Sequence, residues 1–82
     1  MLERGEDGHL VIIEVDAQIA GSVSRIEKRV GDRVHDAEVL LLMESMKMEI
    51  PLLAPCAGRV LELRAEPGQI DAEGEVLVVL GD

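Results

Sequence analysis

The sequence of 82 residues contains no phenylalanine, tyrosine or tryptophan, although hydrophobic residues make up 48% of it. The core must therefore be built from aliphatic side chains and methionine. Functions that depend on aromatic rings are not expected, which removes base stacking on nucleic acids, aromatic cages for cations and aromatic belts at membrane interfaces.

The sequence also offers little for nucleophilic or metal chemistry. Cys56 is the single cysteine, which excludes an internal disulfide and a Cys-rich zinc site. The histidines are His9, near a polar N-terminus, and His35, in a loop-like segment, and no spacing connects either one to Cys56. We expect Cys56 to be a small packed residue and both histidines to be solvated or packed. We predict no catalytic residue and no metal site.

Positive charge is scarce, because eight basic residues stand against seventeen acidic ones and give a formal net charge of −9. Such a surface repels phosphate backbones and anionic lipids, so we expect neither nucleic acid nor a membrane as a partner. No run approaches the roughly 18 apolar residues of a membrane span, and residues 1–7 lack the apolar stretch of a secretion signal. These absences predict a cytoplasmic protein.

What the sequence does contain is an internal repeat with an offset of 37 residues. The aligned pairs include Gly21 with Gly58, Gly31 with Gly68, Ala17 with Ala54, Ala20 with Ala57, Val23 with Val60, and Glu38-Val39-Leu40 with Glu75-Val76-Leu77. A chain of this length forms one domain. A half of about 35 residues cannot bury an apolar face alone, so the two halves must pack together.

Each half consists of short apolar runs separated by turn signals every 8 to 12 residues or so, which is typical of β-strands. Pro51, Pro55 and Pro67 disfavour a helix in the second half. We therefore predict an all-β fold in which two pseudo-symmetric halves form a β-sandwich or flattened barrel.

One segment conflicts with this prediction, because residues 40–50 are mostly strong helix formers. Pro51 blocks any extension of a helix, and the repeat aligns the start of the segment with the strand-like residues 76–80. A strand here must reverse near Met46 and Lys47 without the Gly, Asn or Asp that tight hairpins usually require. A turn made against local preference indicates a functional constraint.

The repeat places Lys47 at a tip opposite the chain ends. The other lysine, Lys28, is expected in mid-strand with its alkyl stem along the surface. Met46 and Met48 flank Lys47, and exposed methionines around an exposed lysine would suit an enzyme that must seat the amine. The residues alone leave two interpretations open: this recognition surface, or core methionines beside a solvated lysine.

The segment Glu44-Ser45-Met46-Lys47-Met48-Glu49-Ile50, followed by Ala54-Pro55 and Gly58, resembles the biotin attachment motif of biotinyl domains, the carrier modules of biotin-dependent carboxylases and decarboxylases. The resemblance implies a flattened barrel of two four-stranded antiparallel sheets with quasi-two-fold symmetry, a barrel-sandwich hybrid. It implies that Lys47, on a hairpin turn, carries biotin through an amide. It assigns residues 10–82 to the biotinyl domain and leaves 1–9 as a polar N-terminal leader.

The same resemblance implies a carrier and not an enzyme. A biotin protein ligase would attach biotin, and the carrier would then pass a carboxyl group from a biotin carboxylase to a carboxyltransferase acting on an acyl-CoA or a keto acid. Recognition by the ligase and the carboxylase would involve Glu44, Ser45, Met46, Met48 and Glu49. Two alternatives are a lipoyl carrier, in which the lysine usually follows an acidic residue and precedes alanine, and an unmodified barrel that serves as an interaction module.

Four places depart from the family pattern, the first being Gln18-Ile19, which replaces the usual Pro-Met in the first half. Ser45 replaces the more common alanine, which we expect to be harmless, and Lys28 falls where an apolar residue is common. In the second half Gln69-Ile70-Asp71 replaces the usual Asp-x-Val, which moves the apolar residue by one position and puts the local strand register in question. The attachment motif itself is intact.

Overall fold

The structure is a computed structural model that describes residues 11–82, so the predicted leader and His9 lie outside the described residues. The described residues form eight β-strands and no helix. The strands are β1 (Ile12–Asp16), β2 (Gly21–Ile26), β3 (Arg33–Val34), β4 (Val39–Ser45), β5 (Met48–Leu53), β6 (Gly58–Leu63), β7 (Ile70–Asp71) and β8 (Val76–Gly81). This confirms the all-β prediction. Over the same range there is accordingly no helix that could cross a membrane.

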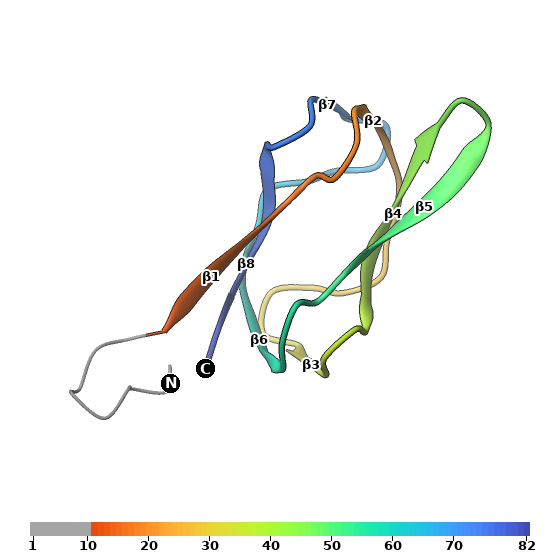
Figure 1. Ribbon diagram of the computed structural model, residues 1–82. Coiled ribbons are helices and arrows are strands. Elements are labelled where there is room, and N and C mark those ends of the chain that lie inside the picture. Colours follow the sequence, from red (N-terminus) through yellow and green to blue (C-terminus); the bar gives the residue numbers. More distant parts are fainter. Residues whose placement is uncertain (1–10) are drawn as a thin grey trace.

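The strands pair into two four-stranded antiparallel sheets, with strand order β1-β8-β6-β3 in one and β5-β4-β2-β7 in the other. Figure 1 shows the sheets facing each other, with the β4–β5 hairpin projecting at one end and the C-terminus lying at the opposite end. The predicted flattened sandwich is therefore confirmed, and the C-terminus lies far from the hairpin.

The repeat relates the two sheets strand by strand. An offset of 37 residues superposes β1 on β5, β2 on β6, β3 on β7 and β4 on β8. Each sheet therefore contains two strands from each half, so neither half forms a sheet alone. This interleaving explains why both halves are needed to cover one apolar core.

The core between the sheets is aliphatic, as the composition requires. Its largest fully buried side chains are Leu40, Leu41, Met43, Leu77, Leu80, Val23, Val60 and Val78. Full burial of such a side chain stabilises the fold by about 1.5–3 kcal/mol. Segment 40–50 thus contributes its apolar residues to a strand, and this burial overrides the helix preference of the same residues.

The register at β7 corrects one prediction. β2 pairs with β7 so that Gly21 lies opposite Asp71 and Ser22 opposite Ile70. Asp71 is 3% exposed and Ile70 is 82% exposed. The sequence pattern indicated a shift that would bury Ile70, and this shift does not occur. Asp71 instead occupies the inward position that Val34 occupies in β3.

The position of Lys28 is the second correction. β2 ends at Ile26, so Lys28 lies in the following loop and not in mid-strand. Its ammonium group forms an ion pair with Glu38, just before β4. The side-chain hydrogen bond between them raises the pKa of Lys28 and lowers the pKa of Glu38. Glu38 also accepts a hydrogen bond from the backbone N–H of His35 at 2.8 Å, so the pair links two connecting segments.

Candidate functional site

The β4–β5 hairpin turns through two residues, Met46 and Lys47, between the cross-strand pair Ser45 and Met48. Both turn residues have positive φ, 51° for Met46 and 68° for Lys47. Positive φ at both central positions is the mark of a type I′ turn, whose twist matches that of the flanking strands. An L-residue in this conformation costs roughly 1–2 kcal/mol. The predicted reversal at these residues is confirmed, and it occurs at a backbone cost.

The hairpin projects its side chains into solvent. Met46 is 90% exposed and Met48 is 58% exposed, whereas Met43, three residues before the turn, is 2% exposed. The interpretation of Met46 and Met48 as core residues is therefore wrong. Lys47 is also exposed. The tip presents one primary amine between two flexible thioethers, and that amine is sterically free to be acylated.

Acidic side chains lie at the base of the hairpin. Glu44 of β4 pairs directly with Glu49 of β5, and Ser22 of β2 pairs with Glu44. With Ile70 of β7, these residues form one row across the outer face of the sheet, which we call the hairpin row. Ser24 Oγ donates a hydrogen bond of 3.3 Å to Glu49 Oε2. Like charges directly opposite each other are destabilising, so folding does not explain the two carboxylates.

Gly21 allows β2 to pack closely against the base of the hairpin. A Cβ atom at this position would lie 2.5 Å from the carbonyl oxygen of Glu44 and 3.3 Å from Cβ of Ser45. The counterpart Gly58 has the same relation to Gly81, with a Cβ-to-oxygen distance of 2.8 Å. Gly21 and Gly58, one of the aligned glycine pairs of the repeat, are therefore places where two strands approach too closely for a side chain.

The two lysines differ in what surrounds their amines. Lys28 is half-buried and its amine is held by Glu38, an interaction that raises its pKa and so disfavours the neutral, nucleophilic form. Lys47 is exposed on the turn and forms no ion pair or hydrogen bond with a described residue. Of the two, Lys47 is the more accessible to an acylating enzyme.

The remaining candidate residues do not assemble into a site. Cys56 is half-buried in the segment between β5 and β6, and His35 is exposed after β3. Within residues 11–82 there is no group of three or more His, Cys, Asp or Glu residues that could hold a metal ion.

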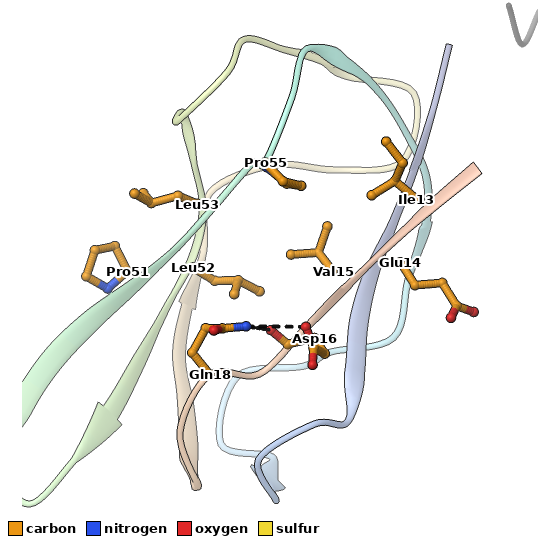
Figure 2. Close-up of a pocket in the computed structure, with 9 residues that line it drawn as sticks. All are labelled: Ile13, Glu14, Val15, Asp16, Gln18, Pro51, Leu52, Leu53 and Pro55. Atoms are coloured by element: carbon orange, nitrogen blue, oxygen red, sulfur yellow. Dashed lines mark hydrogen bonds between the residues drawn. The ribbon is translucent and has the colours of Figure 1, made fainter. Parts of the chain in front are cut away.

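A groove of about 500 Å³ lies away from the hairpin tip, between the edge strands β1 and β5. Its lining residues are Ile13, Glu14, Val15, Asp16, Gln18, Pro51, Leu52, Leu53 and Pro55. Figure 2 shows Val15 and Leu52 between the two strands, while the amide of Gln18 is hydrogen-bonded to Asp16 at one end. The groove has no nucleophile or cation, and Lys47 does not line it.

Comparison with known proteins agrees with this geometry. The model of a family described as "Biotin-requiring enzyme", the biotin and lipoyl family, matches residues 14–80, which include the whole hairpin. The chain belongs to the biotin/lipoyl attachment family. Lys47 and the hairpin turn lie within the matched region.

Two curated relatives of this biotin/lipoyl attachment chain are small proteins. The "Biotin/lipoyl attachment protein" of Bacillus subtilis is 35% identical over 68 residues, which cover 83% of this chain and 93% of the relative. The "Biotinylated protein TB7.3 homolog" of Mycobacterium leprae is 39% identical over 67 residues, which cover 82% of this chain and 94% of the relative. Both matches extend over nearly the full length of the relative.

A solved structure shows the same fold within a much larger enzyme. The match lies in a single-chain, multi-domain long-chain acyl-CoA carboxylase, with a TM-score of 0.81 and 31% sequence identity. The aligned region covers 85% of this chain and 7% of the carboxylase. The chain thus spans a small fraction of that enzyme.

Sequence reasoning missed two features. Ala37 has a φ of 68° at the position where the other half has Gly74, with a φ of 91°. Asp71 is buried, and its Oδ2 atom has no hydrogen-bond partner in the described part of the chain. Both positions could have been found from the repeat, because each breaks it: alanine stands for glycine in one, and aspartate for valine in the other.

Proposed function

We propose that this chain is a biotin carboxyl carrier in which biotin is joined through an amide to Nζ of Lys47. The observation that carries the proposal is the hairpin: a lysine held at the tip of a strained turn between two exposed methionines. The names of the similar proteins support it, since one relative is a biotinylated protein and one solved neighbour is an acyl-CoA carboxylase.

Attachment is an acyl transfer to the lysine amine. The neutral Nζ attacks the activated carboxyl carbon of biotin, an N–C bond forms, the activating group leaves, and Nζ loses a proton. The hairpin supplies the nucleophile and its position, and a separate biotin protein ligase supplies the activated acyl group and accepts the proton. Once bound, biotin contributes a ring nitrogen that can carry a carboxyl group.

The residues around Lys47 act in recognition. Met46 and Met48 offer soft apolar contacts that can adapt to a ligase and to a carboxylase. Glu44 and Glu49 offer a pair of negative charges on the outer face of the hairpin, suited to basic groups on those enzymes. Ser45, half-buried opposite Met48, keeps the side chain at the base of the turn small.

The partners are then a biotin carboxylase, which loads the carrier, and a carboxyltransferase, which unloads it onto an acyl-CoA or a keto acid, both in the cytoplasm. A tethered cofactor gains a high effective concentration at both active sites. A rigid domain with one projecting hairpin suits this role, because Lys47 can enter an active site while the sandwich stays outside.

A lipoyl carrier is the second candidate, because the printed name of the Bacillus subtilis relative includes both attachments. The methionines on both sides of Lys47 favour biotin, since the lipoyl pattern places an acidic residue directly before the lysine.

The test uses the fact that the chain has two lysines, Lys28 and Lys47. We expect the wild-type protein, produced in cells with an active biotin ligase, to gain the mass of one biotin, and peptide mapping to place it on Lys47. Lys47→Arg should abolish avidin capture, whereas Lys28→Arg, which can keep the ion pair with Glu38, should retain it. The mass of a lipoyl group would establish the second candidate, and an unmodified Lys47 would contradict both.

A further inference from the structure

The repeat relates two rows of residues at opposite ends of the sandwich, and the charged side chains of these two rows are of opposite sign. The hairpin row contains Ile70, Ser22, Glu44 and Glu49 in cross-strand register. The repeat maps this row onto Arg33, Arg59, Gly81 and Ile12, which are also in cross-strand register, across β3, β6, β8 and β1. We call this second set the arginine row. Two carboxylates mark the hairpin end, and two guanidinium groups mark the end where β8 terminates.

The two arginines lie side by side in the register of β3 and β6. Arg33 pairs directly with Arg59, and neither forms an ion pair with any of residues 11–82. By contrast, Arg25 is paired with Glu27, and Arg64 with Glu62. Like charges directly opposite each other on a sheet are destabilising. In a protein with seventeen acidic residues, an arginine pair of this kind is not explained by folding.

The arginine row is also partly ordered and partly apolar. Arg59 is half-buried, and its guanidinium donates a hydrogen bond of 3.3 Å to the carbonyl oxygen of Gly31, which fixes its direction. Ile12, at the far end of the row, is 54% exposed, and Val30, next to Gly31, is 61% exposed. Arginine is enriched in protein interfaces, and the buried centre of an interface is more apolar than the rest of the surface.

We infer that the arginine row is a docking surface for an acidic protein surface on the carboxylase that uses this carrier. The inference rests on the proposed function and adds a second contact to it. A polyanion such as nucleic acid is disfavoured by the net charge of −9. A carboxylate-bearing protein surface complements both guanidinium groups, and apolar contacts on Ile12 and Val30 exclude water around them.

A second copy of the chain is the other source of carboxylates, through its own hairpin row. Such a contact would be head-to-tail, would not close into a dimer, and would cover Lys47. The carboxylase is therefore the occupant that the geometry favours. Docked at this end, the carrier keeps its hairpin free, because the hairpin lies at the opposite end of the sandwich (Figure 1).

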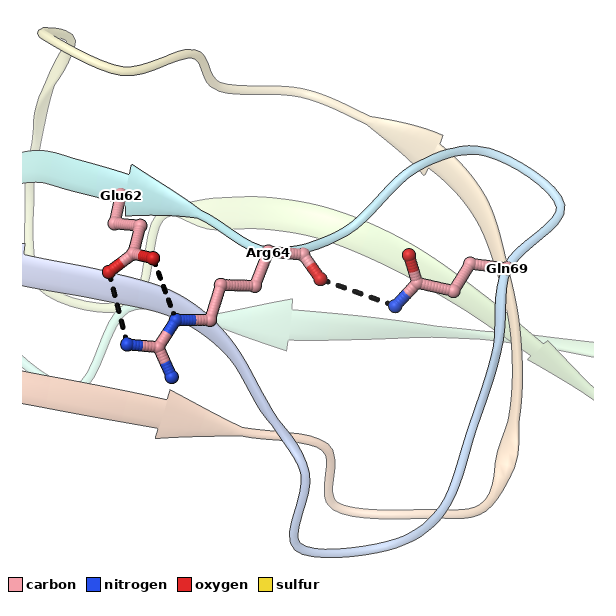
Figure 3. Close-up of polar contacts among 3 residues, drawn as sticks. All are labelled: Glu62, Arg64 and Gln69. Carbon is pink, nitrogen blue, oxygen red and sulfur yellow. Dashed lines mark hydrogen bonds and ion pairs between the residues drawn. The ribbon is translucent and has the colours of Figure 1, made fainter.

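The test compares two double variants with equal changes in charge. Arg33→Glu with Arg59→Glu reverses the charge of the arginine row. Arg25→Glu with Arg64→Glu reverses the charge of two arginines that form ion pairs outside this row. Figure 3 shows the bidentate pair of Arg64 with Glu62. Both biotinylated variants are given to the biotin carboxylase of the source organism with ATP and bicarbonate. For the arginine-row variant we expect the KM for the carrier to rise about tenfold or more, while kcat stays unchanged. The KM of this variant should also no longer depend on salt concentration.

Two further measurements separate the possible failures. Biotinylation by the ligase should be equal for both double variants, since that enzyme acts at the hairpin. Direct binding of the Lys47→Arg chain to the carboxylase should also depend on Arg33 and Arg59, whether or not biotin is attached. Equal KM and equal binding for the two double variants would overturn the docking surface. Self-association of the wild type that the arginine-row variant loses would assign the row to a second copy instead.

Discussion

Asp71 is a buried carboxylate at a place where the repeat has valine. Its Oδ1 atom accepts a hydrogen bond of 2.7 Å from the amide of Gln69, and its Oδ2 atom has no partner among residues 11–82. The same Gln69 amide donates to the carbonyl oxygen of Arg64 at 3.2 Å (Figure 3), so it would keep a partner if Asp71 were replaced. A buried polar atom left without a hydrogen bond costs roughly 1–3 kcal/mol.

We predict that Asp71→Val raises the free energy of unfolding by about 1 kcal/mol or more, because it removes the unsatisfied oxygen and restores the apolar position of the repeat. Urea denaturation measures the change. Val34→Asp places a carboxylate at the equivalent site of the other half and should destabilise the protein. A lower stability for Asp71→Val would show that the carboxylate has a stabilising partner.

The methionines at the hairpin tip give a second prediction. Met46→Leu and Met48→Leu should change the free energy of unfolding by less than about 0.5 kcal/mol, because both side chains are largely exposed. The rate of biotinylation should fall, since leucine is stiffer and lacks the polarisable sulfur. Met43→Ala is the matched control, and it should lose about 2–5 kcal/mol of stability because Met43 lies in the core. Unchanged biotinylation kinetics for both leucine variants would remove the methionines from the recognition surface.

At this scale the sequence predicted an exposed Lys47, left the exposure of Met46 and Met48 open, and did not predict the burial of Asp71. The position of Lys47 followed from the repeat, because its counterpart falls near the chain ends. The repeat aligns Asp71 with the apolar Val34, but aspartate is rarely buried and the adjacent Ile70 offered an apolar alternative one position away, so the sequence pattern favoured burial of Ile70. The pairing of β7 with β2 determines which of the two residues is buried, and that pairing joins residues distant in the sequence.

At the scale of elements, the hairpin is supported from beneath by β2. Gly21 lets the β2 backbone approach the carbonyl of Glu44, one residue before Ser45. Any side chain at this position pushes β4 away from β2 and so tilts the strand that leads into the turn. The position of Lys47 therefore depends on a residue in another strand.

We predict that Gly21→Ala lowers the free energy of unfolding by about 1–3 kcal/mol, as is usual for overpacking, and also slows biotinylation. Gly58→Ala is the control given by the repeat, because its Cβ would meet the carbonyl oxygen of Gly81 at the opposite end. It should cost similar stability and leave biotinylation intact. Equal biotinylation rates for the two alanine variants, measured at a temperature where both are folded, would contradict a role of Gly21 in positioning Lys47.

Segment 40–50 shows what element prediction required. Local propensity favoured a helix, yet the segment forms β4, a two-residue turn and the start of β5. The repeat corrected this, because it aligned the segment with the β-branched residues of β8. Tertiary burial of Leu40, Leu41 and Met43 stabilises the strand, and no local rule accounts for the two left-handed residues at its end.

At the scale of the whole molecule, the repeat predicted a two-fold sandwich, and the structure confirms it. The strand order in each sheet could not be predicted from the sequence alone, since every sheet combines strands from both halves through non-local pairing. The separation of charge between the two ends was equally hidden. Residues 33 and 59 are far apart in the chain, and the register of β3 and β6 places the two arginines side by side.

The placement of Lys47 opposite the end of β8 has a practical consequence for protein engineering. A polypeptide fused after Asp82 would extend from one end of the sandwich, while a biotin on Lys47 would extend from the other. On a streptavidin-coated surface, such a fusion would be held with its cargo facing away from the support and with every molecule in the same orientation. The domain would then serve as a single-point handle for oriented immobilisation.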